Sequence, residues 1–114
     1  MEMTDEKRDG VVIVAPRGRL DVNTSAELEK RLLDKVAAGE TLFVVDLLDI
    51  EYISSAGLRV LLLLAKKLKE RSGRVVLSSL GPAVRQVFEL AGLLPVFAIE
   101  ASREQATARL AAGA

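Results

Sequence analysis

Two adjacent serines, Ser54 and Ser55, stand between an apolar strand-like run and a strongly apolar stretch with helical periodicity. The run over 42–45 leads into this segment, and the acids Asp46 and Asp49 are among the residues between the run and the serines. The first backbone N–H groups of a helix have no partner within the helix, and the helix dipole is positive at that end. The serine segment therefore suits a negatively charged group. A serine there can cap the helix, and its hydroxyl can also accept a phosphoryl group.

Capping alone is one interpretation of these serines, because serine is among the preferred N-cap residues. Two features favour a functional interpretation. The acids follow a buried strand at its carboxyl end, which is where open α/β sheets place their ligand sites. The helix predicted from about Ala56 to Arg71 is also more apolar than burial of a single face requires.

The helix over 56–71 carries two sets of apolar residues. The inward stripe, at helical spacing, consists of Leu58, Leu61, Leu62, Ala65 and Leu68. The second set, which lies off this stripe, consists of Val60, Leu63 and Leu64. An exposed apolar patch beside a serine that can accept a phosphoryl group indicates a protein-binding surface. The alternatives are a helix buried on two sides and a homodimer face. The predicted partner-binding residues are Leu58, Arg59, Val60, Leu63 and Leu64.

The composition excludes several classes of function. With 114 residues the chain suits one domain, 1–114, that begins with a polar lead-in over 1–9. The 16 basic and 16 acidic residues give no net charge, whereas a nucleic-acid binder usually has a basic excess. The absence of Cys and His removes disulfides, Cys/His zinc sites and His-assisted nucleophiles. We therefore predict a protein that is not an enzyme, has no cofactor and does not contact nucleic acid directly.

The chain also lacks the features of a secreted or membrane-inserted protein. Residues 1–10 contain no apolar core of a signal peptide. The longest apolar run, Val60 to Ala65, is far shorter than a membrane span. Because the absence of Cys also fits a reducing compartment, we expect a cytoplasmic protein without membrane insertion.

Short apolar runs alternate with helical patterns, which predicts an α/β domain with a mixed sheet of four to five strands and about four helices packed mainly on one face. The predicted strands cover 11–15, 19–20, 41–45 and 74–78, with a return to the sheet over 93–99. The predicted helices cover 25–38, 56–71, 82–91 and 102–111. The turn signal at 16–18 favours an antiparallel hairpin between the first two strands. Ile50, Tyr52 and Ile53 are expected to anchor a loop.

The boundaries of the helices carry cap signals. Asn23 or Thr24 is the expected N-cap of the helix over 25–38, with Glu27 placed to complete a capping box from Thr24. Gly39 suits the left-handed residue that ends this helix. Ser102 is the expected cap of the last helix.

The serine segment resembles the signature loop of the STAS domain, and specifically of the bacterial anti-sigma factor antagonists. In that family an aromatic-containing segment is followed by an acid, a pair of hydroxyl residues and Gly-Leu, and the text from Tyr52 to Leu58 corresponds to it. Aligned on Gly57, the hydroxyl pair falls on Ser55 and Ala56, and the acid falls on Ser54. Ala56 has no hydroxyl, so the resemblance implies Ser55 as the phosphate acceptor, with Ser54 as the second choice.

The resemblance covers nearly the whole chain and implies a function. Further matching text is found at 18–21, 24–28, 82–84 and 88–93. A STAS domain of this kind binds an anti-sigma factor with serine kinase activity, releases it when phosphorylated at Ser55, and is reset by a serine phosphatase. The partner class is thus an anti-sigma factor, and a weak homodimer is possible. The implied phosphorylation-loop neighbours are Asp21, Asn23, Thr24, Asp46, Asp49, Ser54, Ala56 and Gly57.

Two other functions remain open at the level of sequence. One is an accessory STAS interaction module of a larger signalling or transport assembly that is never phosphorylated. The other is a STAS module that uses the same loop to bind a nucleotide. Asp21, Asp46 and Asp49 could also form a carboxylate site for Mg²⁺, which prefers oxygen ligands, although no resident metal is predicted.

Overall fold

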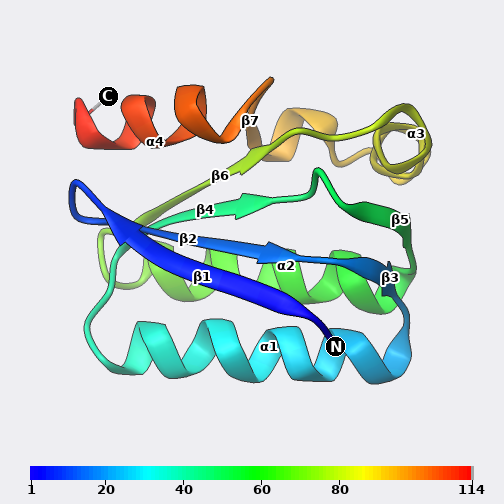
Figure 1. Cartoon of the computed structure of the whole chain (residues 1–114), viewed down its shortest axis with the longest axis horizontal. Coiled ribbons are helices and arrows are strands. Elements are labelled where there is room, and N and C mark those ends of the chain that lie inside the picture. Colours follow the sequence, from blue (N-terminus) through cyan, green and yellow to red (C-terminus); the bar gives the residue numbers. More distant parts are fainter. Residues whose placement is uncertain (114) are drawn as a thin grey trace.

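A five-stranded sheet forms the centre of the computed structural model, which describes residues 1–113 (Figure 1). Its strand order is β1-β2-β4-β6-β7, and all neighbours are parallel except β1 and β2. The strands are β1 (Met3–Arg8), β2 (Val11–Pro16), β4 (Leu42–Asp46), β6 (Arg74–Ser78) and β7 (Ala98–Glu100). Two further strands, β3 (Gly18–Leu20) and β5 (Ile50–Ile53), pair separately. The predicted mixed α/β sheet is confirmed.

Helices cover both faces of this sheet unequally. The helices are α1 (Val22–Ala37), α2 (Ser55–Lys69), α3 (Pro82–Leu90), the 3₁₀ helix η1 (Leu94–Val96) and α4 (Arg103–Ala111). Figure 1 shows α1 and α2 side by side below the sheet, α3 beside β5, and α4 above the sheet. The first three helices pack into one large core, and α4 closes a smaller one. The prediction of four helices, mostly on one face, is therefore confirmed.

The central strands supply both cores because side chains alternate along a strand. All six residues of β2 are buried. Val12 and Val14 face the core of α1 and α2, whereas Val11 and Ile13 face the core of α4. The near-continuous Val and Ile run is the pattern expected of a strand covered on both faces.

The first strands differ from the prediction. The polar lead-in over 1–9 contains β1, which pairs antiparallel with β2 across a turn at Asp9 and Gly10. Both turn residues have positive φ (53° and 80°), as the tight Asp-Gly hairpin requires. The predicted hairpin at 16–18 is wrong, because only Arg17 separates β2 from β3 and a single residue does not reverse the chain. Instead, β3 pairs parallel with β5.

The segment predicted as a loop over 50–53 is itself a strand. Ile50 and Ile53 of β5 are buried and Tyr52 is exposed, so Tyr52 does not anchor the segment. This strand also determines where the helices that follow β3 and β5 begin. Since β3 leads into α1 and β5 leads into α2, their parallel pairing brings the starts of both helices to one end of the molecule.

Candidate functional site

The two helix starts are joined by the backbone. Leu20 of β3 pairs with Ile53 of β5, and the N–H of Ser54 donates a hydrogen bond of 2.9 Å to the carbonyl oxygen of Leu20. The next residue on each strand caps a helix: Asp21 caps α1 and Ser54 caps α2. The site is therefore a pair of adjacent helix N-termini, held in register by a two-stranded parallel sheet.

The two serines have different roles in this geometry. The Oγ of Ser54 accepts a hydrogen bond of 3.3 Å from the backbone N–H of Gly57, as an N-cap should. Ser55 is the first residue of α2 and is exposed, and its hydroxyl bonds to none of the other side chains described over 1–113. The sequence prediction that one serine caps the helix is confirmed for Ser54, which leaves the Ser55 hydroxyl accessible.

Gly57 allows the start of α2 to lie close to the two strands. A Cβ atom placed on Gly57 would lie 2.8 Å from Cγ1 of Ile53 and 3.1 Å from Cβ of Leu20. Normal carbon–carbon contacts are about 3.5–4.0 Å. The requirement for glycine at this position is therefore steric, and it sets how near Ser54 and Ser55 lie to β3.

The N-terminus of α1 is closed by a capping box that begins earlier than predicted. A carboxylate oxygen of Asp21 accepts hydrogen bonds of 3.0 Å from the N–H groups of Asn23 and Thr24. The Thr24 Oγ1 accepts one of 2.9 Å from the N–H of Asp21. Asp21 is thus the N-cap, and the predictions of Asn23 or Thr24 as cap and of a box from Thr24 to Glu27 are wrong. Asn23 and Thr24 lie inside the helix, which starts at Val22, and Thr24 takes part in the box as its N3 residue.

The cap also controls the charge of Asp21. Hydrogen bonds from the backbone N–H and the hydroxyl of Thr24 hold the pKa of this carboxyl below its usual value. The single hydrogen of the Thr24 hydroxyl is shared between Oδ1 of Asp21 at 3.0 Å and the carbonyl oxygen of Arg19 at 2.6 Å, which ties the cap back to β3. The α1 side of the site therefore carries a permanent negative charge at neutral pH.

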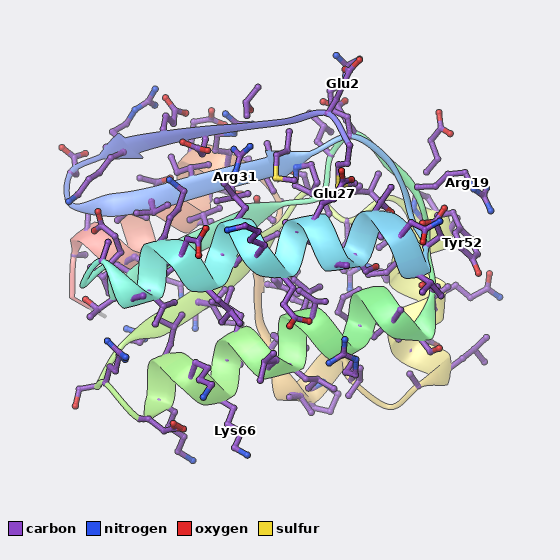
Figure 2. The ribbon with its side chains drawn as sticks, turned by 90° about the horizontal axis from the view of Figure 1, so that it is seen from below. Glu2, Arg19, Glu27, Arg31, Tyr52 and Lys66 are labelled. Carbon is purple, nitrogen blue, oxygen red and sulfur yellow. The ribbon has the colours of Figure 1, made fainter. Side chains whose placement is uncertain are left out.

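The structure places exposed apolar and aromatic side chains at this end that were not predicted as site residues. Val22 is 74% exposed and Tyr52 is 40% exposed. The guanidinium of Arg19 lies 4.3 Å from the centre of the Tyr52 ring, and Figure 2 shows the pair beside the start of α1. Strand pairing of β3 with β5 creates this arrangement, so only the weak signal of an aromatic between two isoleucines was available in the sequence.

The predicted partner-binding residues on α2 are only partly available. Leu58, Val60 and Leu64 are buried, because α2 packs both on the sheet and along α1. Leu58 faces inward as predicted for the stripe, which leaves it unavailable to a partner, whereas the assignment of Val60 and Leu64 to an exposed surface is wrong. The alternative of a helix buried on two sides is correct. Arg59 is exposed and Leu63 is half-buried. Leu62, predicted to face inward, is instead at the surface.

Asp46 does not join the serine segment. Its side chain is 2% exposed and accepts a hydrogen bond of 3.1 Å from Ser78 and one of 2.9 Å from Nε of Arg103. Burial acts to lower the pKa of Arg103, but the hydrogen bonds to Asp46 and Glu6 and the negative charges of these two residues together outweigh burial and raise the pKa. The carboxylate therefore fastens α4 to the sheet, and none of its hydrogen bonds goes to Ser54 or Ser55.

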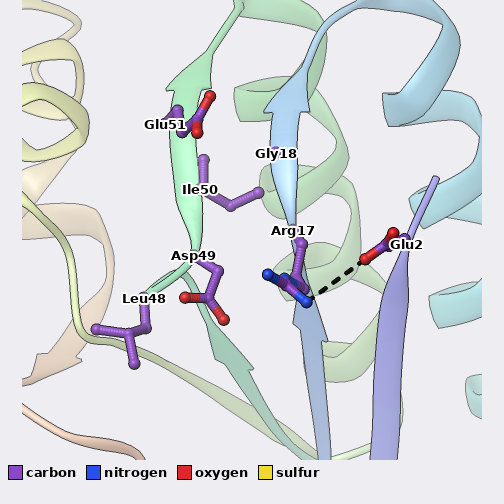
Figure 3. Close-up of a pocket in the computed structure, with 7 residues that line it drawn as sticks. All are labelled: Glu2, Arg17, Gly18, Leu48, Asp49, Ile50 and Glu51. Carbon is purple, nitrogen blue, oxygen red and sulfur yellow. Dashed lines mark ion pairs between the residues drawn. The ribbon is translucent and has the colours of Figure 1, made fainter.

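Asp49 lies in a separate surface hollow. This pocket has a volume of about 560 Å³ and is lined by residues of the N-terminus, the β2–β3 junction and β5 (Figure 3). Arg17 and Glu2, at its edge, form an exposed ion pair of 3.5 Å. Among residues 1–113 no three His, Cys, Asp or Glu side chains are close enough to hold a metal ion. The hypothesis that Asp21, Asp46 and Asp49 form one Mg²⁺ site is therefore wrong.

Of the other predicted neighbours, Ala56 follows Ser55 on α2 and is half-buried. The site is formed by two helix starts, the exposed serine, and a rim of Arg19, Tyr52 and Val22.

Within residues 1–113, none of the helices combines the length and the apolar character that crossing a bilayer requires.

Comparisons with known proteins agree on one family. The chain is 44% identical over 108 residues to BtrV of Bordetella bronchiseptica, a protein named as a candidate anti-sigma factor antagonist, and the match covers 95% of this chain and 93% of BtrV. It is 30% identical over 95 residues to the anti-sigma-F factor antagonist RsfB of Mycobacterium tuberculosis, covering 83% of this chain and 77% of RsfB. A crystal structure of an anti-sigma factor antagonist from Mycobacterium paratuberculosis superposes with a TM-score of 0.86 at 30% identity, covering 95% and 92% of the two chains.

The family profile of the STAS domain matches residues 2–106, which includes both helix starts and the serine segment between them. The profile, the relatives and the superposed fold all agree with the resemblance in the serine segment. This chain belongs to the STAS domain family.

Proposed function

We propose that this chain is a partner-switching anti-sigma factor antagonist that is controlled by phosphorylation of Ser55. The observation that carries the proposal is the exposed hydroxyl of Ser55 at the first position of α2, in a chain whose similar proteins are named anti-sigma factor antagonists. The chain acts as a regulator in the bacterial cytoplasm and not as an enzyme. Its partner is an anti-sigma factor with serine kinase activity, and a serine phosphatase restores the unmodified form.

The docking surface is the end of the molecule where α1 and α2 begin. It offers Val22 and Tyr52 as apolar contacts, with Arg19 and Arg59 as exposed charges. Aromatic and Arg side chains are enriched where protein interfaces bind most strongly. Leu62 and Leu63 extend this surface along α2, in place of the buried leucines.

Phosphorylation changes this surface without threatening the fold. A phosphoryl group adds about −1.5 to −2 charges at neutral pH. At Ser55 it lies at the positive end of α2, where unpaired backbone N–H groups stabilise an anion. Ser55 is exposed, so no core packing is lost. The partner surface has no such compensation, and a penalty of about 3 kcal/mol from repulsion and desolvation lowers affinity more than a hundredfold.

The test begins with protein recovered from its native host under several growth conditions, measured by intact mass and phosphopeptide mapping. We expect phosphate on Ser55 in some conditions and not in others. The partner co-purified with unmodified protein should have the sequence of an anti-sigma factor kinase, and with ATP and Mg²⁺ it should phosphorylate wild-type protein but not Ser55→Ala. Ser54→Ala is the matched control, because it removes the cap and leaves the proposed acceptor.

Binding measurements complete the test. Ser55→Ala should bind the captured partner as wild-type does, and Ser55→Asp should bind at least tenfold more weakly. Protein that is unmodified in every condition, or Ser55→Asp that binds at wild-type affinity, contradicts the switch. Either result favours an accessory interaction module.

A further inference from the structure

An ion pair links the two helices close to the start of α2. Nη2 of Arg59 lies 3.2 Å from Oε1 of Glu29, which belongs to α1. The Arg59 side chain is 66% exposed and that of Glu29 is 30% exposed. Exposed pairs of this kind contribute little to stability, so Arg59 is held loosely and can exchange partners.

The position of Arg59 on α2 relates it to Ser55. The two residues are four positions apart on the same helix, which places them on one face with their Cβ atoms about 6 Å apart. Long side chains on a helix lean toward its N-terminus. The guanidinium of Arg59 can therefore reach the turn that carries Ser55 as well as Glu29.

We infer that Arg59 is the phosphate-binding residue of the switch: phosphorylation of Ser55 draws its guanidinium from Glu29 to the phosphate. This inference rests on the proposed phosphorylation of Ser55. A phosphate carries nearly twice the charge of a carboxylate and binds guanidinium through two parallel hydrogen bonds, whereas Glu29 holds Arg59 through one. The exchange also leaves Glu29 as an unpaired carboxylate on α1, so one modification changes the charge pattern on both helices.

Two other charged groups lie at this end, and a more distant lysine on α2 provides a control. Arg19 of β3 lies over the ring of Tyr52, and Asp21 lies at the start of α1. Lys66 also lies on α2 and is exposed (Figure 2). It faces the same side as Ser55 but lies about 16 Å further along the helix. Lys66 is therefore a matched control for a cation on α2 that is too distant to contact the phosphate.

The experiment uses full-length protein with phosphoserine incorporated at position 55 during translation, so that no kinase is needed. The second pKa of the phosphate is measured by ³¹P NMR titration. A neighbouring cation favours the dianion and lowers this pKa. We expect Arg59→Gln to raise it by about half a unit, the size of an exposed ion pair. Lys66→Gln should change it by about 0.1 unit or less, since intervening solvent screens the charge.

Glu29→Gln supplies the second arm. It should lower the phosphate pKa, because Arg59 is no longer held by Glu29. Removal of any nearby carboxylate has some effect of this sign, so the same change is made in the Arg59→Gln background. If Glu29 acts by holding Arg59, Glu29→Gln shifts the phosphate pKa less than half as much in that background as in the wild-type background.

Two results would overturn the inference. One is an equal phosphate pKa in Arg59→Gln and Lys66→Gln, and the other is a larger increase in Arg19→Gln than in Arg59→Gln. Neither result affects the proposed function, which fails instead if Ser55 is never phosphorylated in the host. The two ideas can therefore fail separately.

Discussion

Replacement of Gly57 by alanine tests whether the close approach of α2 to β3 and β5 is a requirement of the fold. The added Cβ would lie 2.8 Å from Cγ1 of Ile53 and 3.1 Å from Cβ of Leu20. Overpacking of this kind costs about 1–3 kcal/mol, whereas the helix propensity of alanine contributes about 1 kcal/mol in the opposite direction. We expect a net loss of about 1 kcal/mol, which corresponds to a decrease in Tm of about 4 °C for a domain of this size.

The assay is urea unfolding followed by far-ultraviolet circular dichroism, because the chain contains no Trp. Ile53→Ala removes the atom that lies 2.8 Å away and serves as the matched background. In the Ile53→Ala background, the loss of unfolding free energy caused by Gly57→Ala should be smaller by about 1 kcal/mol or more than in the wild-type protein. This is the size of coupling expected between contacting residues. Faster hydrogen exchange of the Ser54 amide, which bonds to Leu20, should accompany the loss. A Gly57→Ala protein that is more stable than wild type would refute the steric argument.

Three further predictions follow from the same structure. Arg103→Met should lower the free energy of unfolding by about 2–3 kcal/mol, because it leaves the buried carboxylate of Asp46 without its cation. Urea unfolding should show that adding Asp46→Asn restores part of this loss, and equal losses in the single and double variants would contradict the argument. Asp21→Ala should lower Tm at pH 7. Because the folded pKa of Asp21 is lowered, the charge-dependent part of its stabilisation is complete above the unfolded pKa of about 3.9 and is lost as pH falls through the folded value. The Tm difference from wild type should therefore shrink below about pH 4. A difference that does not depend on pH would show that the charge of Asp21 is not the source of the stabilisation. Val22→Ser should keep the free energy of unfolding within about 0.5 kcal/mol of the wild-type value and weaken binding to the captured partner about fivefold or more. Unchanged affinity would place the docking surface elsewhere.

Elements whose signals are local were predicted closely. The strand over 74–78 has the observed bounds of β6, and Pro82 begins α3 as predicted. Ser102 caps α4, and Ser54 caps α2, because both cap signals depend on residues three positions apart. The left-handed Gly39 after α1 was also predicted correctly, with φ at 100°. These features depend on backbone preferences over a few residues, which the sequence displays directly.

Errors arose where a choice depended on distant residues or on competing local signals. The residues before the Asp9–Gly10 turn are polar and carry no apolar strand pattern, yet β1 needs only an open edge of β2 to form. Asp21 takes the cap because β3 ends at Leu20, and β3 exists only because β5 pairs with it. No periodicity within either short segment shows that pairing.

The candidate site divides in the same way. The sequence alone determined that a serine lies at the start of an apolar helix after an acid-bearing segment, because residue order and helix periodicity suffice for that. Only the tertiary structure decided that Asp46 serves Arg103, that Val60 and Leu64 are buried against neighbouring elements, and that Tyr52 is exposed under Arg19. The physical reason is that burial and ion pairing depend on which surfaces meet, and those surfaces lie far apart along the chain.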